Sequence, residues 1–141
     1  MTFAAASVPV VLDASFAMEV LTGAEAYRDA WGEWVGSGIT VLVPAHFWAE
    51  VGNALLLGAG IPALEASARL ERFAAAGPDV ADRGADGVRD ALALAERHRL
   101  TVYEALYLQL ALDVEGEIAT LDRPLSRAAK ASGVPLVRVR S

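Results

Sequence analysis

Short apolar runs alternate along this chain with longer segments whose apolar residues recur at helical spacing, and this alternation limits the fold more than any other feature. Strands that follow one another through helices pair in parallel, because each connection must cross over the sheet. The crossover helices then cover both faces of the sheet. The sequence therefore predicts an α/β fold of three layers, with helices on both faces of a mostly parallel sheet of about four to five strands.

The expected elements follow one another without a linker. The expected strands are residues 8–12, 39–43, 117–121 and 136–139, with weak strand character at 79–81. The expected helices are residues 45–58, 63–75, 85–98, 102–113 and 123–132, preceded by a helical pattern up to Val35. With 141 residues, 55% hydrophobic composition and no repeat, the chain is expected to form one domain over residues 1–141.

Composition excludes several classes of function. The chain has no cysteine, so disulfides and thiolate metal sites are excluded, and a metal must be held by carboxylate, imidazole or backbone groups. The net charge of -6 argues against nonspecific coating of nucleic acid, which depends on many basic side chains. Glycines and a proline interrupt the longest apolar region, residues 51–64, so no membrane span is expected. No Lys or Arg precedes the first apolar residues, which argues against a signal peptide. We therefore expect a cytoplasmic protein.

Four acidic residues stand out because the pattern predicts that they share one location. Asp13 and Asp122 each directly follow a short apolar run. Both are therefore expected at the carboxyl ends of buried strands, where open α/β sheets bind ligands. Glu50 and Glu104 interrupt otherwise apolar helices, where an unpaired charge is costly. The four side chains are candidates for a shared acidic pocket.

Ordinary structural roles are also open to these acids. Asp13 and Asp122 directly precede expected helices, where a side-chain oxygen commonly caps the first turn, and a proline in the first turn after Asp122 strengthens that pattern. Glu104 could complete a capping box with Thr101. Capping does not exclude contact with a metal, so both roles remain open. His46 is expected to be structural, because no second histidine lies at ligand spacing.

Four segments of this chain together carry a resemblance to a known family: residues 10–15, 44–55, 100–108 and 119–122, which include Val-Leu-Asp-Ala-Ser at 11–15 and Ala-Thr-Leu-Asp at 119–122. In this order and spacing they resemble the PIN-domain ribonucleases, in particular the VapC-type toxins of toxin-antitoxin systems. The resemblance spans nearly the whole chain. It implies a PIN-like fold, a Mg²⁺- or Mn²⁺-dependent endoribonuclease that cleaves RNA phosphodiester bonds, a cognate antitoxin protein and a homodimer.

The resemblance implies a metal pocket made of Asp13, Glu50, Glu104 and Asp122. We expect Asp13 and Glu104 to be the main metal contacts. Glu50 is expected to bind directly or through water, and Asp122 to act as an outer ligand or to position a water molecule. The chemistry agrees, because converging carboxylates repel one another and hard divalent cations prefer oxygen ligands. A metal-bound water is a nucleophile for the phosphodiester.

Further polar residues are expected around this pocket. Three of them are candidates to orient the acids through hydrogen bonds: Ser15, Asn53 and Thr120. Three basic residues, spaced by four and three positions on the expected last helix, are candidates to bind RNA: Arg123, Arg127 and Lys130. An ordinary solvated helix face explains the same spacing, so both interpretations remain open.

The first helical region carries more large apolar residues than one covered helix needs: Phe16, Met18, Val20, Leu21, Tyr27, Trp31 and Trp34. This excess suggests an association surface, although core packing explains part of it. In the family that the chain resembles, such surfaces form the homodimer and bind the antitoxin.

Two positions depart from the pattern of that family. Glu104 stands where its members most often carry Asp, and the additional methylene moves the carboxylate outward by about 1.5 Å. Glu19 lies near a position where they often carry Lys, so a basic contact to RNA is missing. The sequence therefore leaves a second function open, that of a weakly active or inactive PIN-fold module that binds protein.

Overall fold

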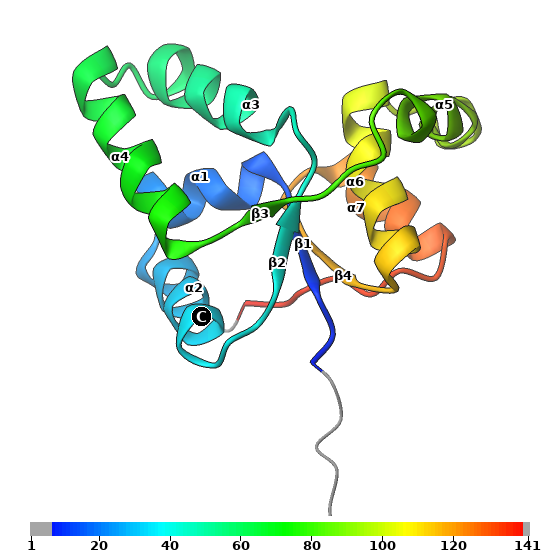
Figure 1. The fold of residues 1–141 in the computed structure, drawn as a ribbon, viewed down its shortest axis with the longest axis horizontal. Helices are drawn as coiled ribbons and strands as arrows, with labels where there is room; N and C mark the ends of the chain where they lie inside the picture. Colours follow the sequence, from blue (N-terminus) through cyan, green and yellow to red (C-terminus); the bar gives the residue numbers. More distant parts are fainter. Residues whose placement is uncertain (1–6, 140–141) are drawn as a thin grey trace, which may run out of the picture.

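A four-stranded parallel sheet forms the centre of the protein in a computed structural model that describes residues 7–139 (Figure 1). The strands are β1 (Val10–Leu12), β2 (Val41–Val43), β3 (Asp79–Val80) and β4 (Glu117–Ala119), in the order β3-β2-β1-β4. In the register, Val10 of β1 pairs with Val41 on one side and Glu117 on the other. The first strand therefore lies inside the sheet, and all three of its side chains are buried.

Helices cover both faces of this sheet, which confirms the predicted three-layer α/β fold (Figure 1). On one side lie α1 (Ala14–Thr22), α2 (Glu25–Gly36), α3 (Phe47–Asn53), the π-helical segment η1 (Ala54–Gly58) and α4 (Ala63–Ala76). On the other side lie α5 (Ala85–His98), α6 (Val102–Val114) and α7 (Arg123–Ala131). No helix within residues 7–139 is long and apolar enough to cross a membrane.

Two elements differ from those that periodicity predicts. The expected helix 45–58 is α-helical only to Asn53 and then widens into η1. The expected last strand, 136–139, forms only a single parallel bridge between Leu136 and Ile118. Pro135 has no N–H to extend that pairing backwards, and the last backbone bond to β4 is donated by Val137 to Ile118 at 2.9 Å. The expectation of no signal peptide rests on residues up to Ala6, which lie outside the described residues.

The large apolar residues of the first helical region lie in the core or pack against it. The ring of Phe16 stacks on Trp34 with centroids 5.4 Å apart, and Trp31 packs on Phe73 of α4 at 4.6 Å. Within residues 7–139, the exposed large hydrophobic residues include none of the seven residues proposed for association. Five of the seven are only partly buried, so core packing accounts for part of the excess and the association surface stays a prediction.

Candidate active site

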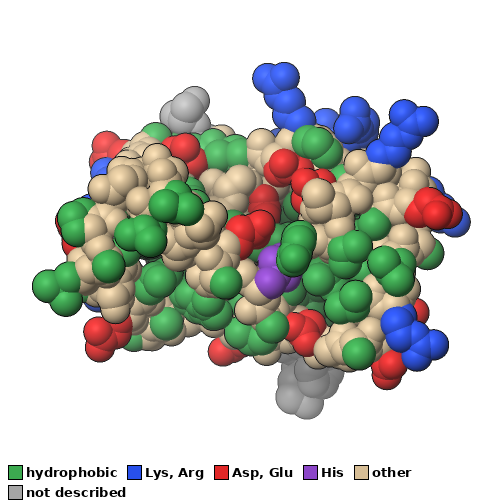
Figure 2. All heavy atoms as spheres, turned by 90° about the horizontal axis from the view of Figure 1, so that it is seen from above, with side chains coloured by type: hydrophobic (Ala, Val, Ile, Leu, Met, Phe, Trp, Pro, Cys, Tyr) green, Lys and Arg blue, Asp and Glu red, His purple; other side chains and the backbone are tan. Residues whose placement is uncertain are grey.

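The four acids expected to share a location line one pocket of about 240 Å³ at the carboxyl end of the sheet. Asp13 directly follows β1, and Asp122 precedes α7 just after β4. Glu50 enters the pocket from α3 and Glu104 from the first turn of α6. In Figure 2, which looks onto this edge from above, acidic side chains gather near the middle of the face beside a histidine, while Lys and Arg side chains lie toward its rim. The topology thus brings together residues that are more than 100 positions apart.

Asp13 is held by two hydroxyl groups and caps no helix. The residue is 6% exposed, and its Oδ2 accepts hydrogen bonds from Ser15 Oγ at 2.5 Å and from Thr120 Oγ1 at 2.6 Å. No described backbone N–H of α1 reaches the side chain, so the alternative role as an N-cap is wrong. Burial raises the pKa of Asp13, and the two hydroxyl bonds lower it in part. The charges of Glu50 and Asp122 add to the rise in this pKa.

The same hydroxyl groups tie the ends of β1 and β4 together. Thr120 Oγ1 accepts a bond from the backbone N–H of Asp122 at 3.0 Å, and Ser15 Oγ accepts one from the N–H of Leu121 at 2.9 Å. Each hydroxyl therefore donates to Asp13 while it accepts from the loop after β4. This network fixes the loop that carries Asp122 relative to the buried carboxylate.

Asp122 and Glu104 combine a capping role with a place in the pocket. Asp122 Oδ2 accepts the N–H of Leu125 at 2.8 Å and so caps α7. Glu104 completes the predicted capping box, since its N–H donates to Thr101 Oγ1 at 3.1 Å and its Oε2 accepts the N–H of Thr101 at 3.4 Å. Burial raises the pKa of Glu104, and the charge of Asp122 raises it further. The capping alternatives are confirmed for both residues, and neither keeps the side chain out of the pocket.

Glu50 is anchored by a residue that sequence analysis did not single out. The hydroxyl of Tyr107, on α6, donates to Glu50 Oε1 at 2.6 Å. Burial and this bond raise the pKa of Tyr107 far above its usual range, so the phenol stays protonated and acts as a donor. Tyr107 is three residues after Glu104 and therefore lies on the same side of the helix. That spacing is the sequence feature from which its place near the site could have been predicted. The partner in α3, however, becomes evident only from the packing.

His46 lies close to this pair. Its ring packs edge-to-face against Tyr107 with centroids 5.0 Å apart, and its Nε2 lies 4.0 Å from Glu50 Oε1. This nitrogen is buried and has no hydrogen-bond partner in the described part of the chain. Burial lowers the pKa of His46, against the opposing charges of Asp13 and Asp82. The ring is therefore expected to be neutral at pH 7 and to contribute packing.

The donor set fits a hard divalent cation in chemistry. Within residues 7–139, each of the four acids uses one carboxylate oxygen for a protein hydrogen bond and leaves the other without one: Asp13 Oδ1, Glu50 Oε2, Glu104 Oε1 and Asp122 Oδ1. No Lys or Arg side chain lines this pocket. Over the same described range, no three acidic or histidine side chains yet lie close enough to hold an ion together. Hard cations prefer such oxygens, and a bound cation would offset the mutual repulsion of the four carboxylates.

The remaining residues proposed from the sequence lie outside this pocket. Asn53 is exposed and its side chain makes no hydrogen bond within the described residues, so nothing supports its expected role in orienting Glu50. The three basic residues on α7 are exposed and form no ion pair within residues 7–139: Arg123, Arg127 and Lys130. Their charges are therefore available to a ligand.

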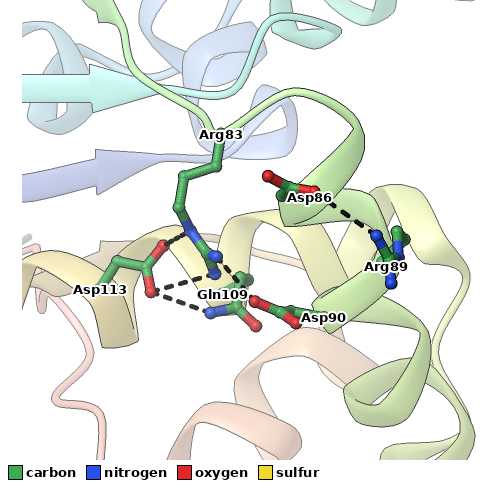
Figure 3. A network of polar contacts seen from close by, with 6 residues as sticks. All are labelled: Arg83, Asp86, Arg89, Asp90, Gln109 and Asp113. Carbon is green, nitrogen blue, oxygen red and sulfur yellow. Dashed lines mark hydrogen bonds and ion pairs between the residues drawn. The ribbon is translucent and has the colours of Figure 1, made fainter.

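A polar network on the outer side holds α6 in place (Figure 3). Arg83, between β3 and α5, donates from Nε to Asp113 of α6 at 2.9 Å and from Nη1 to Asp90 of α5 at 2.7 Å. Gln109 Nε2 also donates to Asp113, at 2.9 Å. Each exposed pair contributes little stability, but together they join both helices to the loop after β3. The network therefore ties the C-terminal half of α6, the helix that carries Glu104, to its neighbours.

Comparison with known proteins gives consistent matches. The family model described as PIN domain matches residues 10–131. Ribonuclease VapC3 of Pyrobaculum aerophilum is 43% identical over 51 residues, which are 36% of this chain and 39% of that relative, so the match spans well under half of either protein.

Three solved structures resemble the fold. The protein PAE2754 from Pyrobaculum aerophilum has a TM-score of 0.68 and 22% identity, over 86% of this chain and 79% of that one. A toxin-antitoxin complex from Klebsiella pneumoniae has a TM-score of 0.62 and 17% identity, over 80% and 86%. VapC20 of Mycobacterium tuberculosis, described as a sarcin-ricin loop cleaving toxin, has a TM-score of 0.69 and 18% identity, over 92% and 98%.

Proposed function

The chain belongs to the PIN-domain family, and on this premise we propose that it is a divalent-metal-dependent endoribonuclease and the toxin of a toxin-antitoxin pair. One observation carries the proposal. Four carboxylates, two from the ends of β1 and β4 and two from α3 and α6, line a single pocket, and each leaves one oxygen without a protein partner in the described residues. Such a group of like charges is tolerable when a divalent cation neutralises it.

Mg²⁺ or Mn²⁺ would be held by Asp13, Glu104, Glu50 and Asp122. When bound, such an ion activates a water molecule for attack on the phosphodiester and offsets the charge on the developing oxyanion. Asp13 is the best-ordered contact, because its other oxygen is fixed by two hydroxyl groups. Asp122 remains partly engaged with the first turn of α7, which suits an outer ligand or a group that orients water.

The RNA backbone would be bound next to this pocket by the basic face of α7. Arg123 directly follows Asp122, and Arg127 and Lys130 continue along the same helix. All three are exposed, and phosphate contacts of this kind position RNA without reading its sequence. The net charge of -6 limits nonspecific binding elsewhere on the surface.

The proposed partners are RNA, a cognate antitoxin protein and a second copy of the chain. Support for the antitoxin comes from the structural similarity to one chain of a toxin-antitoxin complex from Klebsiella pneumoniae. We further propose that residues 1–141 act as one domain, since the matched region covers residues 10–131 around a single core.

A second function is favoured by one specific observation. Glu104 Oε2 accepts the N–H of Thr101 in the capping box of α6, and Glu104 is one methylene longer than the Asp that members of the family most often carry here. If the Glu104 carboxylate binds only Thr101 and no metal, the chain would retain the fold and bind protein with little catalysis. Metal binding separates the two functions.

The test is cleavage of a mixed pool of tRNA, rRNA and mRNA by purified protein with Mg²⁺ or Mn²⁺. EDTA and the variant Asp13→Asn serve as negative controls. Asp29→Asn is the matched control, because Asp29 is an exposed acid of α2 outside the pocket. Cleavage that requires metal, is lost in Asp13→Asn and survives in Asp29→Asn supports the nuclease. The absence of both cleavage and metal binding would favour the protein-binding module.

A further inference from the structure

The hydrogen bond between Tyr107 and Glu50 joins α6 to α3, the two helices that carry Glu104 and Glu50. Tyr107 lies in the middle of α6 and is 1% exposed. Its hydroxyl donates to Glu50 Oε1 at 2.6 Å, a short distance typical of a bond to a charged acceptor. A phenol buried this completely needs a partner for its hydroxyl. Glu50 is the partner that the fold supplies.

Glu50, in contrast, has little else to hold it. Its side chain is 41% exposed, and an exposed glutamate side chain can rotate about three torsions. His46 Nε2 lies at 4.0 Å from Oε1, which is too far for a hydrogen bond. Within residues 7–139, the Tyr107 hydroxyl is therefore the single hydrogen-bond donor to this carboxylate.

We propose that Tyr107 is a positioning residue that occupies Oε1 of Glu50 and thereby presents Oε2 to the divalent cation. This inference rests on the proposed function, because it assigns a role within the same pocket. It parallels the arrangement at Asp13, where Ser15 and Thr120 both bond to Oδ2 and leave Oδ1 without a protein partner in the described residues. Residues that orient metal ligands in this way set both affinity and geometry.

The packing around Tyr107 makes it a rigid support. Its ring lies against His46 in an edge-to-face arrangement with centroids 5.0 Å apart. Its neighbours on α6, Ala105 and Leu108, are fully buried. The hydroxyl therefore cannot follow Glu50 if that side chain swings toward solvent, so the bond selects one position of the carboxylate.

The test is the affinity of the full chain for Mn²⁺, measured by titration calorimetry and by electron paramagnetic resonance of the free ion. Tyr107→Phe removes only the hydroxyl and is expected to weaken Mn²⁺ binding about 10-fold. Tyr103→Phe is the matched control on the same helix. Tyr103 is 63% exposed, and its hydroxyl makes no hydrogen bond to the described residues, so this variant should bind Mn²⁺ like the parent.

A double-mutant cycle separates positioning from a general loss of structure. In a Glu50→Ala background, Tyr107→Phe should cause no further loss of Mn²⁺ affinity, because the group through which it acts is gone. The same loss in both backgrounds overturns the positioning role, as does equal affinity of Tyr107→Phe and the parent. A parent chain that binds no Mn²⁺ overturns the proposed function itself, and the positioning role with it.

Discussion

Replacement of Thr120 by valine tests the hydroxyl network directly, because the two side chains have nearly the same shape. The change removes the bond to Asp13 Oδ2 at 2.6 Å and the bond from the N–H of Asp122 at 3.0 Å. A hydrogen bond to a charged group contributes about 1.5–3 kcal/mol and a neutral one about 0.5–1.5 kcal/mol. Because Thr120 is half-buried, water replaces part of both, and we expect a loss of about 2 kcal/mol.

The assay is urea denaturation of the metal-free protein at pH 7, followed by circular dichroism. Thr22→Val is the matched control, because the hydroxyl of Thr22 donates only to the carbonyl of Met18 in an exposed helical turn, at 2.7 Å. That variant should change the free energy of unfolding by less than about 0.5 kcal/mol. A loss in Thr120→Val no larger than in Thr22→Val would refute the inference that the network stabilises the ionised carboxylate.

The destabilisation caused by Thr120→Val should also depend on pH in a definite direction. The Thr120 hydroxyl bonds to the ionised form of Asp13, so its removal raises a pKa that already lies above the usual 3.8. The charge-dependent part of the destabilisation should be fully present above the pKa that Asp13 has in the variant. It should disappear as the pH falls below the pKa of Asp13 in the parent. A destabilisation that grows toward acid pH contradicts this assignment.

Three further predictions concern the acids and the basic helix. Asp13→Asn should abolish cleavage and Mn²⁺ binding, yet leave the metal-free protein at least as stable at pH 7 by thermal unfolding. The reason is that folding raises the pKa of Asp13 above 3.8. The parent therefore loses stability as the pH rises from 3.8 through the raised pKa, and the variant does not. A Tm of Asp13→Asn clearly below that of the parent would contradict this. Glu104→Asp should have a kcat/KM at least equal to that of the parent on the RNA that the parent cuts, because it restores the shorter acid that members of the family most often carry. An inactive variant would show that the pocket had adapted to the longer acid. In the Asp13→Asn protein, Arg127→Ala should weaken binding to all RNA sequences equally and reduce the slope of log binding constant against log salt concentration by about one. An unchanged slope would show that Arg127 does not contact the RNA backbone.

Much of the fold could be predicted because the packing demands recur along the sequence. A buried parallel strand is a short apolar run, and a covering helix repeats its apolar residues every three or four positions, so β1, β2, β4 and the long helices lie close to the predicted ranges. The strand β3 was hardly visible, since both of its residues are exposed. The end of the chain was overestimated, because alternation at 136–139 cannot indicate where pairing stops.

The site could be predicted only in part, for a related reason. The four acids were recognisable because charge is unusual next to apolar runs. The bonds that hold Asp13 are set by Thr120, which is 107 positions away, and local sequence instead favoured a helix cap. Tyr107 resembles any aromatic residue of a covered helix until α3 is packed against α6 and brings Glu50 to its hydroxyl. Helix caps are local, so the capping box of α6 and the Asp122 cap of α7 could be predicted.

The two edges of the sheet set a limit on how copies of this chain can assemble. At one edge, β3 is only two residues long, follows Pro78 and begins with the exposed Asp79, which makes it a poor template for a strand from another molecule. At the other edge, the bridge from Leu136 to Ile118 already occupies part of β4. Growth of the sheet across two molecules is thereby discouraged at both ends, so an interface away from the sheet edges would leave undisturbed the strands that position Asp13 and Asp122.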